Sequence, residues 1–177
     1  PLDCGQASIH NFLLKFWVNI IVFKGQQHEG FDSNAGDTCI YPSNLPCRSY
    51  QLNIVKKALY HNTLVVLPTG LGKTFIAAVV MYNMYRWYPK GKIIFMAPTR
   101  PLVTQQIEAC QQIMPFSCRD TVELTGKLPK SKRAELWKSK RVFFATPQSV
   151  QSDIMGQSNE EDDSSSTEEI FPYTDIK

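Results

Sequence analysis

Apolar residues recur in the middle of the chain in short runs of two kinds, one with the helical period and one typical of buried strands. Leu52, Val55 and Leu59 fall on one helical face, so a helix is expected from Arg48 onward. A β-branched run follows, and then a long apolar stretch without Gly or Pro. The pattern predicts further helices over 73–88, 101–114 and 131–138, and strands over 63–67, 92–97, 121–124 and 141–145.

Strands that alternate with helices predict an α/β fold with a parallel sheet and helices on both of its faces. Ligands of such sheets gather at the carboxyl ends of the strands. The expected organisation is a poorly defined extension over 1–36, one domain over 37–155, an acidic disordered insertion over 156–170, and a final segment over 171–177.

The strand and helix predicted around residues 67–74 enclose Leu-Pro-Thr-Gly-Leu-Gly-Lys-Thr. Gly70 and Gly72 can adopt backbone angles closed to other residues, so that successive N–H groups face phosphate oxygens at a helix N-terminus. Lys73 is expected to reach the β- and γ-phosphates, and the Thr74 hydroxyl to bind Mg²⁺. Leu67 stands where the general pattern has its first glycine. The segment Leu67, Pro68, Thr69, Gly70, Leu71, Gly72, Lys73 and Thr74 therefore predicts a site for ATP with Mg²⁺.

Charge and cysteine content narrow the class of protein. The net charge is +3, but residues 1–156 carry 18 Lys and Arg against 9 acids, whereas the last 21 residues are acidic. A basic body fits a polyanionic partner, although it also fits an ordinary solvated surface. The five cysteines form neither a zinc pattern nor an even disulfide framework, which favours a reducing compartment. No apolar run is long enough to span a membrane.

The glycine-rich segment resembles motif I of superfamily 2 helicases, in which the first Gly is commonly missing. Arg48-Ser49-Tyr50-Gln51 lies upstream of it and resembles the Q motif of the same superfamily. The resemblance implies that Arg48 and Gln51 belong to the ATP site and that the Gln51 carboxamide recognises adenine through its paired donor and acceptor. The alternative is an ordinary helix start with an exposed glutamine.

Three further turns match helicase motifs in family order. Ala97–Gln106 resembles motif Ia, and Leu124-Thr125-Gly126 and Ala145-Thr146-Pro147-Gln148 resemble the next two strand-end motifs. Each could instead be a plain turn, because Thr-Gly and Thr-Pro are common turn residues. The resemblance implies contacts to a nucleic-acid backbone from Thr99, Arg100, Pro101, Thr125, Gly126, Thr146 and Pro147. The basic residues of 127–141 could support that backbone or form a solvated helix face.

Residues 68–83 and 95–110 narrow the resemblance to the Fanconi anaemia group M helicases, related to archaeal Hef. Similarity extends from about Gly36 to Gln148. It implies the first RecA-like P-loop NTPase domain of an ATP-dependent DNA helicase or translocase of the 3'-5' type. Such enzymes act on branched or forked DNA in replication-fork and interstrand crosslink repair, which implies a nuclear protein.

The family also needs an Asp-Glu-x-His motif, and the sequence contains none. Residues 171–177 look like the lead-in to the strand that carries it, so we expect a domain incomplete at its C-terminus, with the motif in the residues that follow. The parent protein is then an enzyme, whereas this piece is expected to bind ATP and hydrolyse it very slowly. Two alternatives remain open: an RNA-sensing or RNA-processing helicase of the same superfamily, and a non-catalytic nucleic-acid-binding module.

Overall fold

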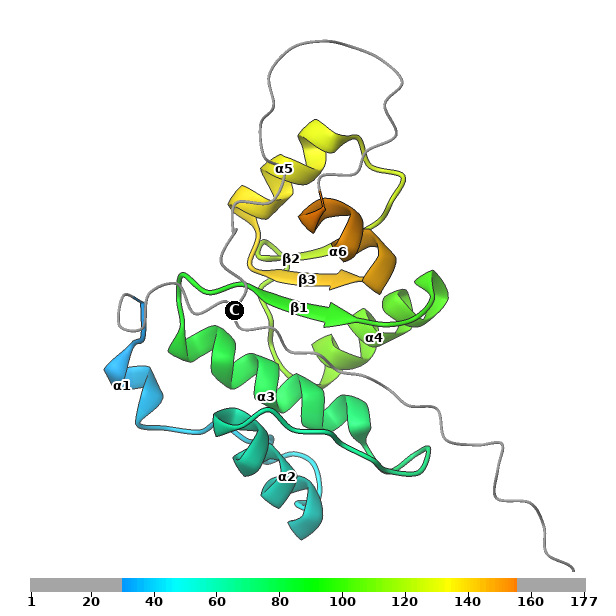
Figure 1. Cartoon of the computed structure of the whole chain (residues 1–177). Coiled ribbons are helices and arrows are strands. Elements are labelled where there is room, and N and C mark those ends of the chain that lie inside the picture. The colour runs from blue at the N-terminus through cyan, green and yellow to red at the C-terminus, as the bar shows by residue number, and fades with distance from the viewer. Residues whose placement is uncertain (1–29, 156–177) are drawn as a thin grey trace, which may run out of the picture.

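The computed structural model describes residues 30–155, and these form a three-layer α/β structure (Figure 1). The sequence expectations for 1–29, the acidic insertion at 156–170 and the segment 171–177 lie outside the described residues. The elements are α1 Ser33–Gly36, α2 Ser49–Tyr60, α3 Lys73–Trp87, β1 Ile93–Met96, α4 Arg100–Ile113, β2 Thr121–Leu124, α5 Lys130–Ser139, β3 Val142–Ala145 and α6 Pro147–Ile154.

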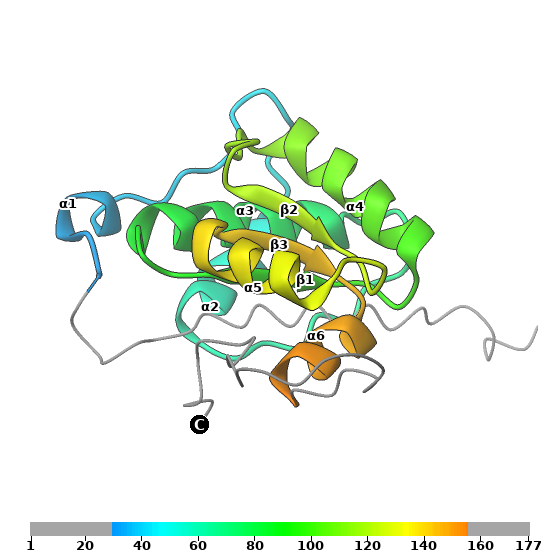
Figure 2. The same ribbon diagram turned by 90° about the horizontal axis from the view of Figure 1, so that it is seen from above.

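The three strands form one parallel sheet in the order β1-β3-β2 (Figure 2). The register pairs Met96 with Ala145, and Leu124 with the same Ala145. The three strands therefore end level with one another, at one edge of the sheet. The predicted parallel sheet is confirmed, and so are strands at three of the four predicted places.

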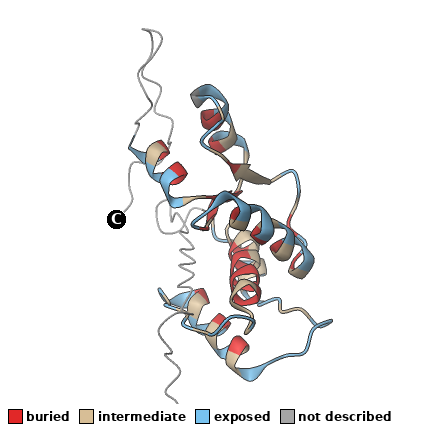
Figure 3. Cartoon of the chain, turned by 90° about the vertical axis from the view of Figure 1, so that its right-hand side faces the viewer, coloured by how far each residue is buried: buried red, intermediate tan, exposed pale blue. Residues whose placement is uncertain are grey.

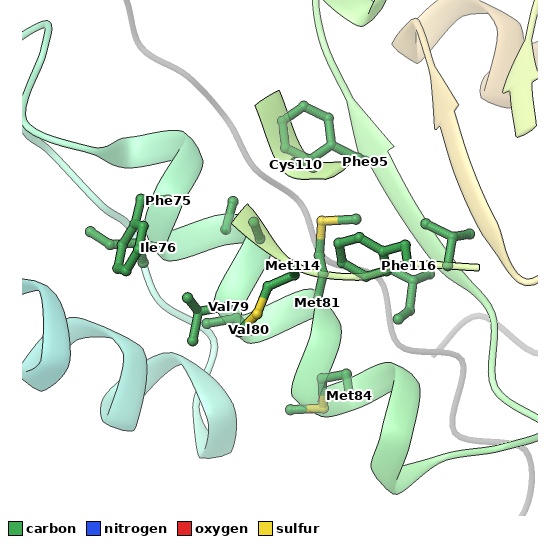
Figure 4. Close-up of a cluster of buried hydrophobic side chains, with 14 of the residues drawn as sticks. Phe75, Ile76, Val79, Val80, Met81, Met84, Phe95, Cys110, Met114 and Phe116 are labelled. Carbon is green, nitrogen blue, oxygen red and sulfur yellow. The ribbon is translucent and has the colours of Figure 1, made fainter. Parts of the chain in front are cut away.

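One face of the sheet is covered by α3 and α4. Alternate residues of β1 and β3 point to this face, where Phe95 and Phe144 stack with ring centroids 5.3 Å apart. Figure 4 shows how apolar side chains of α3, including Val80 and Met81, meet residues of α4 and of the segment after it. Most residues of α3 are buried (Figure 3), because α2 packs on this helix from the side away from the sheet. The prediction of a buried helix is confirmed.

The opposite face is covered by α5 and α6. Trp137 of α5 stacks on Phe143 of β3 with centroids 4.0 Å apart, and Val150 of α6 completes the cluster. Trp137 Nε1 donates to Asp153, which also forms a buried ion pair with Arg133. Helices on both faces confirm the predicted architecture. Trp137 is fully buried and belongs to the core of this face.

The strand predicted over 63–67 is wrong for the described part of the chain. The segment between α2 and α3 is extended but pairs with no strand among residues 30–155. Its side chains alternate: Val65 and Leu67 pack against the core, whereas Leu64 and Val66 are 68% and 65% exposed. β propensity marks a chain that fits a pleated surface, but a strand also needs a neighbour to share its hydrogen bonds.

Two helices were not expected. α1 is a four-residue turn within a segment expected to be a loop, and Asp32 caps its N-terminus by accepting from Ala35 N. α6 begins immediately after β3, where Thr146 accepts from Ser149 N and Pro147 occupies the first turn. The sequence signal for a turn at Thr146-Pro147 was therefore also a helix start, because a capping threonine followed by proline favours one.

Asn83 fixes the chain that leads toward α2. This fully buried residue of α3 donates to Ile40 O at 2.8 Å and accepts from Ile40 N at 2.7 Å. It also donates to Val79 O within its own helix. One side chain thus satisfies the backbone of a segment 43 residues away and places residues 41–48 beside the start of α3.

Candidate nucleotide and nucleic-acid site

The glycine-rich loop connects the extended segment to α3. Gly70 and Gly72 have φ of +84° and +82°, in the left-handed region that the sequence analysis expected of them. Gly72 is also the N-cap of α3. A Cβ on Gly72 would lie 2.3 Å from Gln51 Nε2, so α2 and the loop approach each other as closely as a glycine allows.

Lys73 folds back onto the loop that precedes it. Its ammonium nitrogen donates to Leu67 O at 2.7 Å and to Pro68 O at 3.0 Å. Pro68 and Thr69 are exposed, whereas Leu67 packs against the core. The Lys73 ammonium, Pro68 and Thr69 therefore lie on one side of the loop, and Leu67 holds the other side against the core.

Two side chains of α2 hold the carbonyl of Leu71. Tyr50 donates its hydroxyl to Leu71 O at 3.0 Å, and Gln51 donates from Nε2 to the same oxygen at 3.2 Å. Arg48 donates in turn to the Tyr50 hydroxyl at 3.2 Å. The Leu71 carbonyl points toward α2. Hydrogen bonds from two side chains in the first turn of α2 therefore hold this helix to the loop.

An open pocket lies where α2 and the loop meet. Tyr41 packs edge-on against Phe75 beside it, with ring centroids 5.4 Å apart. Burial, with a smaller contribution from Cys47, raises the pKa of the Tyr41 hydroxyl and keeps it neutral. The pocket is lined by Leu45, Pro46, Arg48, Gln51, Gly70, Gly72 and Phe75.

Thr74 lies in the first turn of α3, next to Lys73. Its hydroxyl donates to Gln106 Oε1 of α4 at 2.7 Å. Gln106 is buried, with 6% of its surface exposed. The hydroxyl proton is thereby directed away from the loop, and the oxygen lone pairs remain available to a cation.

The predicted nucleic-acid residues lie at the carboxyl ends of the three strands, on the side toward which all arrowheads in Figure 1 point. The turn after β1 exposes Thr99, Arg100 and Pro101, and the turn after β2 exposes Gly126 beside a half-buried Thr125. Arg100 Nη2 lies 3.7 Å from where a Cβ of Gly126 would stand. These two turns are therefore neighbours in space.

The turn after β3 completes this edge. Pro147 is exposed, whereas the Thr146 hydroxyl is engaged with Ser149, as N-cap of α6 and at 3.0 Å from its Oγ. Ser149 Oγ also lies 4.0 Å from the Cβ position of Gly126, which links this turn to the one after β2. The sheet thus gathers all three motif-like turns, and Arg100 and Lys127 are exposed cations on them.

The basic residues of 127–141 divide into two sets. Arg133 is buried against Asp153, and Arg141 donates to Tyr85 O and Tyr88 O while its guanidinium lies 4.0 Å from the Tyr85 ring centre. Lys140 donates to Arg119 O. These three serve the fold, so they do not belong to a solvated cationic face. Of the other basic residues in this range whose exposure the structure describes, Lys127, Lys132 and Lys138 are exposed.

Sequence reasoning missed several residues of this site. Tyr50 lay inside the quoted Q motif, and Gln106 inside motif Ia, but neither was assigned a role. A polar residue at a helix position whose neighbours Val103 and Cys110 are apolar was the available signal for Gln106. Pro46 and Phe75 line the pocket without carrying any chemistry that a motif would mark.

Within residues 30–155, no helix is long and apolar enough to cross a membrane. The same residues contain no cluster of three or more His, Cys, Asp or Glu side chains that could hold a metal ion.

Residues 48–170 match the DEAD/DEAH box helicase family. The chain is 74% identical over 127 residues to the DEAD-box ATP-dependent DNA helicase Fancm of Drosophila melanogaster, covering 72% of this chain and 8% of that protein. It is 61% identical over 127 residues to the DEAD-box ATP-dependent RNA helicase FANCM of Arabidopsis thaliana, covering 71% and 9%. The mouse Fanconi anemia group M protein homolog is 58% identical over 125 residues, covering 71% and 6%.

Among solved structures, the Hef helicase domain of Pyrococcus furiosus superimposes with a TM-score of 0.55 and 35% identity, covering 62% of this chain and 23% of that one. This likeness confirms the expected RecA-like fold. The chain itself spans 6–9% of the length of the three curated relatives named above. The chain therefore belongs to the DEAD/DEAH box helicase family, in the group that contains the Fanconi anaemia group M helicases.

Proposed function

We propose that this chain is the ATP-binding part of an ATP-dependent DNA helicase or translocase that acts on branched DNA. The observation that carries the proposal is the loop at the start of α3. Two left-handed glycines, a lysine ammonium and a threonine hydroxyl meet there beside a pocket lined by Gln51. A helix N-terminus with these groups suits a triphosphate and its cation.

The residues present fit Mg²⁺-ATP. The Thr74 hydroxyl donates a hydrogen bond to Gln106 Oε1, which leaves the lone pairs of the Thr74 oxygen free for Mg²⁺. Lys73 would exchange the carbonyls of Leu67 and Pro68 for phosphate oxygens, a stronger partner for an ammonium. Gln51, with Arg48 and the pocket around them, would hold the adenine. When bound, Mg²⁺ would neutralise charge on the phosphates.

The strand-end turns would hold the nucleic acid. Arg100 supplies an exposed cation, and the turns that contain Thr99, Gly126 and Pro147 are exposed beside it. Phosphate contacts from such groups position a protein on a duplex or single strand without reading its sequence. Thr125 and Thr146 would contribute less directly, because both are half-buried.

The names of relatives support the assignment of DNA as the substrate. The Drosophila and fission-yeast proteins are named ATP-dependent DNA helicases, and others carry the Fanconi anaemia group M name. From the resemblance to this group, we propose that the parent protein acts in the nucleus, in the repair of forks and interstrand crosslinks. Residues 37–155 would form part of its first RecA-like domain.

The sequence holds no Asp-Glu-x-His, the motif whose acids bind Mg²⁺ and orient the attacking water in the family. The chain is therefore expected to bind ATP without turning it over at an appreciable rate. ATP turnover by the purified chain, with and without forked DNA and beside Lys73→Ala, tests this directly.

Nucleotide binding that Lys73→Ala weakens, without turnover, would support the proposal. Turnover that is lost in Lys73→Ala would show that this chain positions the water by itself, and the argument from the missing motif would fail. Absence of nucleotide binding by the unaltered chain would overturn the assignment of the loop.

An RNA substrate is the second candidate, since the Arabidopsis relative is named an RNA helicase. Competition between forked DNA and double-stranded RNA of equal length for the same labelled probe separates the two. Equal or better competition by RNA would overturn the DNA assignment. Binding of either that is unchanged by ATP would favour a non-catalytic binding module.

A further inference from the structure

The hydrogen bond between Thr74 and Gln106 joins two helices at the ATP site. Thr74 lies at the start of α3, and Gln106 lies at the middle of α4, 32 residues later. The two oxygens are 2.7 Å apart, a distance typical of a well-formed O–H···O bond. Gln106 is therefore held against the one hydroxyl that the proposed function assigns to Mg²⁺.

The position of Gln106 favours an apolar side chain on packing grounds. Val103 and Cys110, one turn on either side, belong to the buried cluster and are 1% and 0% exposed. Burial raises the pKa of the Cys110 thiol to about 12, which shows how poorly these surroundings tolerate charge. A buried amide here costs free energy unless it is hydrogen-bonded, and Thr74 provides a partner.

The direction of the bond has a chemical consequence. A threonine hydroxyl has one proton and two lone pairs, and a cation binds through a lone pair. A proton pointing at Mg²⁺ would oppose binding. Gln106 Oε1 accepts this proton and so holds the hydroxyl in the one orientation that suits a cation, without itself touching the ion or the nucleotide.

We propose that Gln106 is a positioning residue for Mg²⁺-ATP, which acts by keeping the Thr74 hydroxyl oriented with its lone pairs toward the cation. The inference rests on the proposed ATP function of the loop. It assigns a role in the nucleotide site to α4, whose N-terminal turn carries Arg100. A residue with this role should matter only when the cation is present.

The test compares affinity for ATP with Mg²⁺ and with EDTA, by calorimetry on the full chain. Gln106→Leu removes the acceptor and should weaken Mg²⁺-ATP binding about fivefold, the effect of one lost hydrogen bond, while Mg²⁺-free affinity stays within about twofold. Gln105→Leu, on the exposed side of the same helix, is the matched control and should change neither affinity.

A double-mutant cycle with Thr74→Val sharpens the result. Once the hydroxyl is gone, Gln106→Leu should have no further effect on Mg²⁺-ATP affinity, so the two losses are strongly non-additive. Circular dichroism confirms that each variant is folded, and Gln106→Met serves if the leucine variant does not fold.

Each failure has its own meaning. Equal losses with and without Mg²⁺ would reduce Gln106 to a packing residue, and additive losses in the cycle would show that it acts apart from Thr74; either overturns the inference and leaves the ATP site standing. If Gln106→Leu leaves Mg²⁺-ATP affinity unchanged, the inference is likewise overturned and the ATP site stands. Failure of the unaltered chain to bind ATP would overturn both the inference and the proposed function.

Discussion

The glycine-rich loop and the three turns after the strands share one edge of the molecule but are held in place in different ways. Each turn follows a strand that is paired in the sheet, and the register of β1, β2 and β3 places the turns side by side. The loop follows an extended segment that pairs with no strand in the described part of the chain. Its shape depends on two glycines and on side chains that hold its carbonyls.

The comparison shows two ways in which a protein can fix the conformation of a binding site. The loop keeps its conformation without a neighbouring strand, because its positive φ angles and the Lys73 hydrogen bonds are local and two side chains of α2 hold the Leu71 carbonyl. A surface made from several turns depends on the pairing of strands far apart in sequence. Substitutions of the exposed loop residues and loop glycines should therefore act mainly on nucleotide binding, and substitutions of buried strand residues mainly on stability.

The largest effect is expected from Gly72→Ala, compared with Gly126→Ala. Gly72 has a φ of +82°, and its new Cβ would stand 2.3 Å from Gln51 Nε2, whereas the nearest atom to a Cβ on Gly126 is 3.7 Å away. The strain of about 1–2 kcal/mol plus the collision should lower ATP affinity by roughly 30-fold or more. Calorimetry should find Gly126→Ala unchanged; equal losses would show that the loop is not specially constrained.

The next largest effect is expected on the free energy of unfolding, when Val142→Thr is compared with Val66→Thr. Val142 of β3 is fully buried, so its new hydroxyl loses water and should cost about 1–3 kcal/mol of unfolding free energy. Val66 is 65% exposed and should change stability by less than about 0.5 kcal/mol. Urea denaturation measures both. A large loss for Val66→Thr would mean that the segment before the loop is paired and buried in solution.

A smaller effect is expected from Tyr50→Phe, which removes the hydroxyl that donates to Leu71 O. One lost hydrogen bond of about 1 kcal/mol should weaken ATP binding about fivefold and leave DNA binding unchanged. Tyr60→Phe is the control, because this residue ends the same helix and is 71% exposed. If Tyr50→Phe binds ATP normally, Gln51 alone suffices to hold the loop.

The smallest effect is expected from Arg100→Ala. A single lost phosphate contact should weaken binding of forked DNA about threefold and lower the slope of affinity against salt by about one, without changing ATP affinity. Arg119→Ala is the matched control, since Arg119 is exposed but precedes β2 at the opposite edge of the sheet. Equal effects of the two substitutions on a salt titration would indicate a diffuse cationic surface in place of a site at the strand ends.

Much of the fold could be predicted because its signals are local. The apolar periodicity of 73–88 and the run 141–145 marked α3 and β3 within a residue or two. The glycine spacing of the loop predicted its left-handed angles, and the order of motifs predicted the family. In these segments the residue types alone restrict the backbone angles or require burial, so the segments can be predicted without knowing which residues pack against them.

What the sequence by itself determined is therefore the three strands of the sheet with the helices between them, the left-handed glycines of the loop, and the family. Only the tertiary structure decided that residues 63–67 pair with no strand in the described region, that Arg133 and Arg141 serve the core, and that Thr74 meets Gln106. Strand pairing, ion pairs and contacts between helices all join residues distant in the chain. Packing of the whole chain decides which residues form these contacts. The sequence pattern indicates only that a residue is suited to such a contact, and it does not identify the residue that it meets.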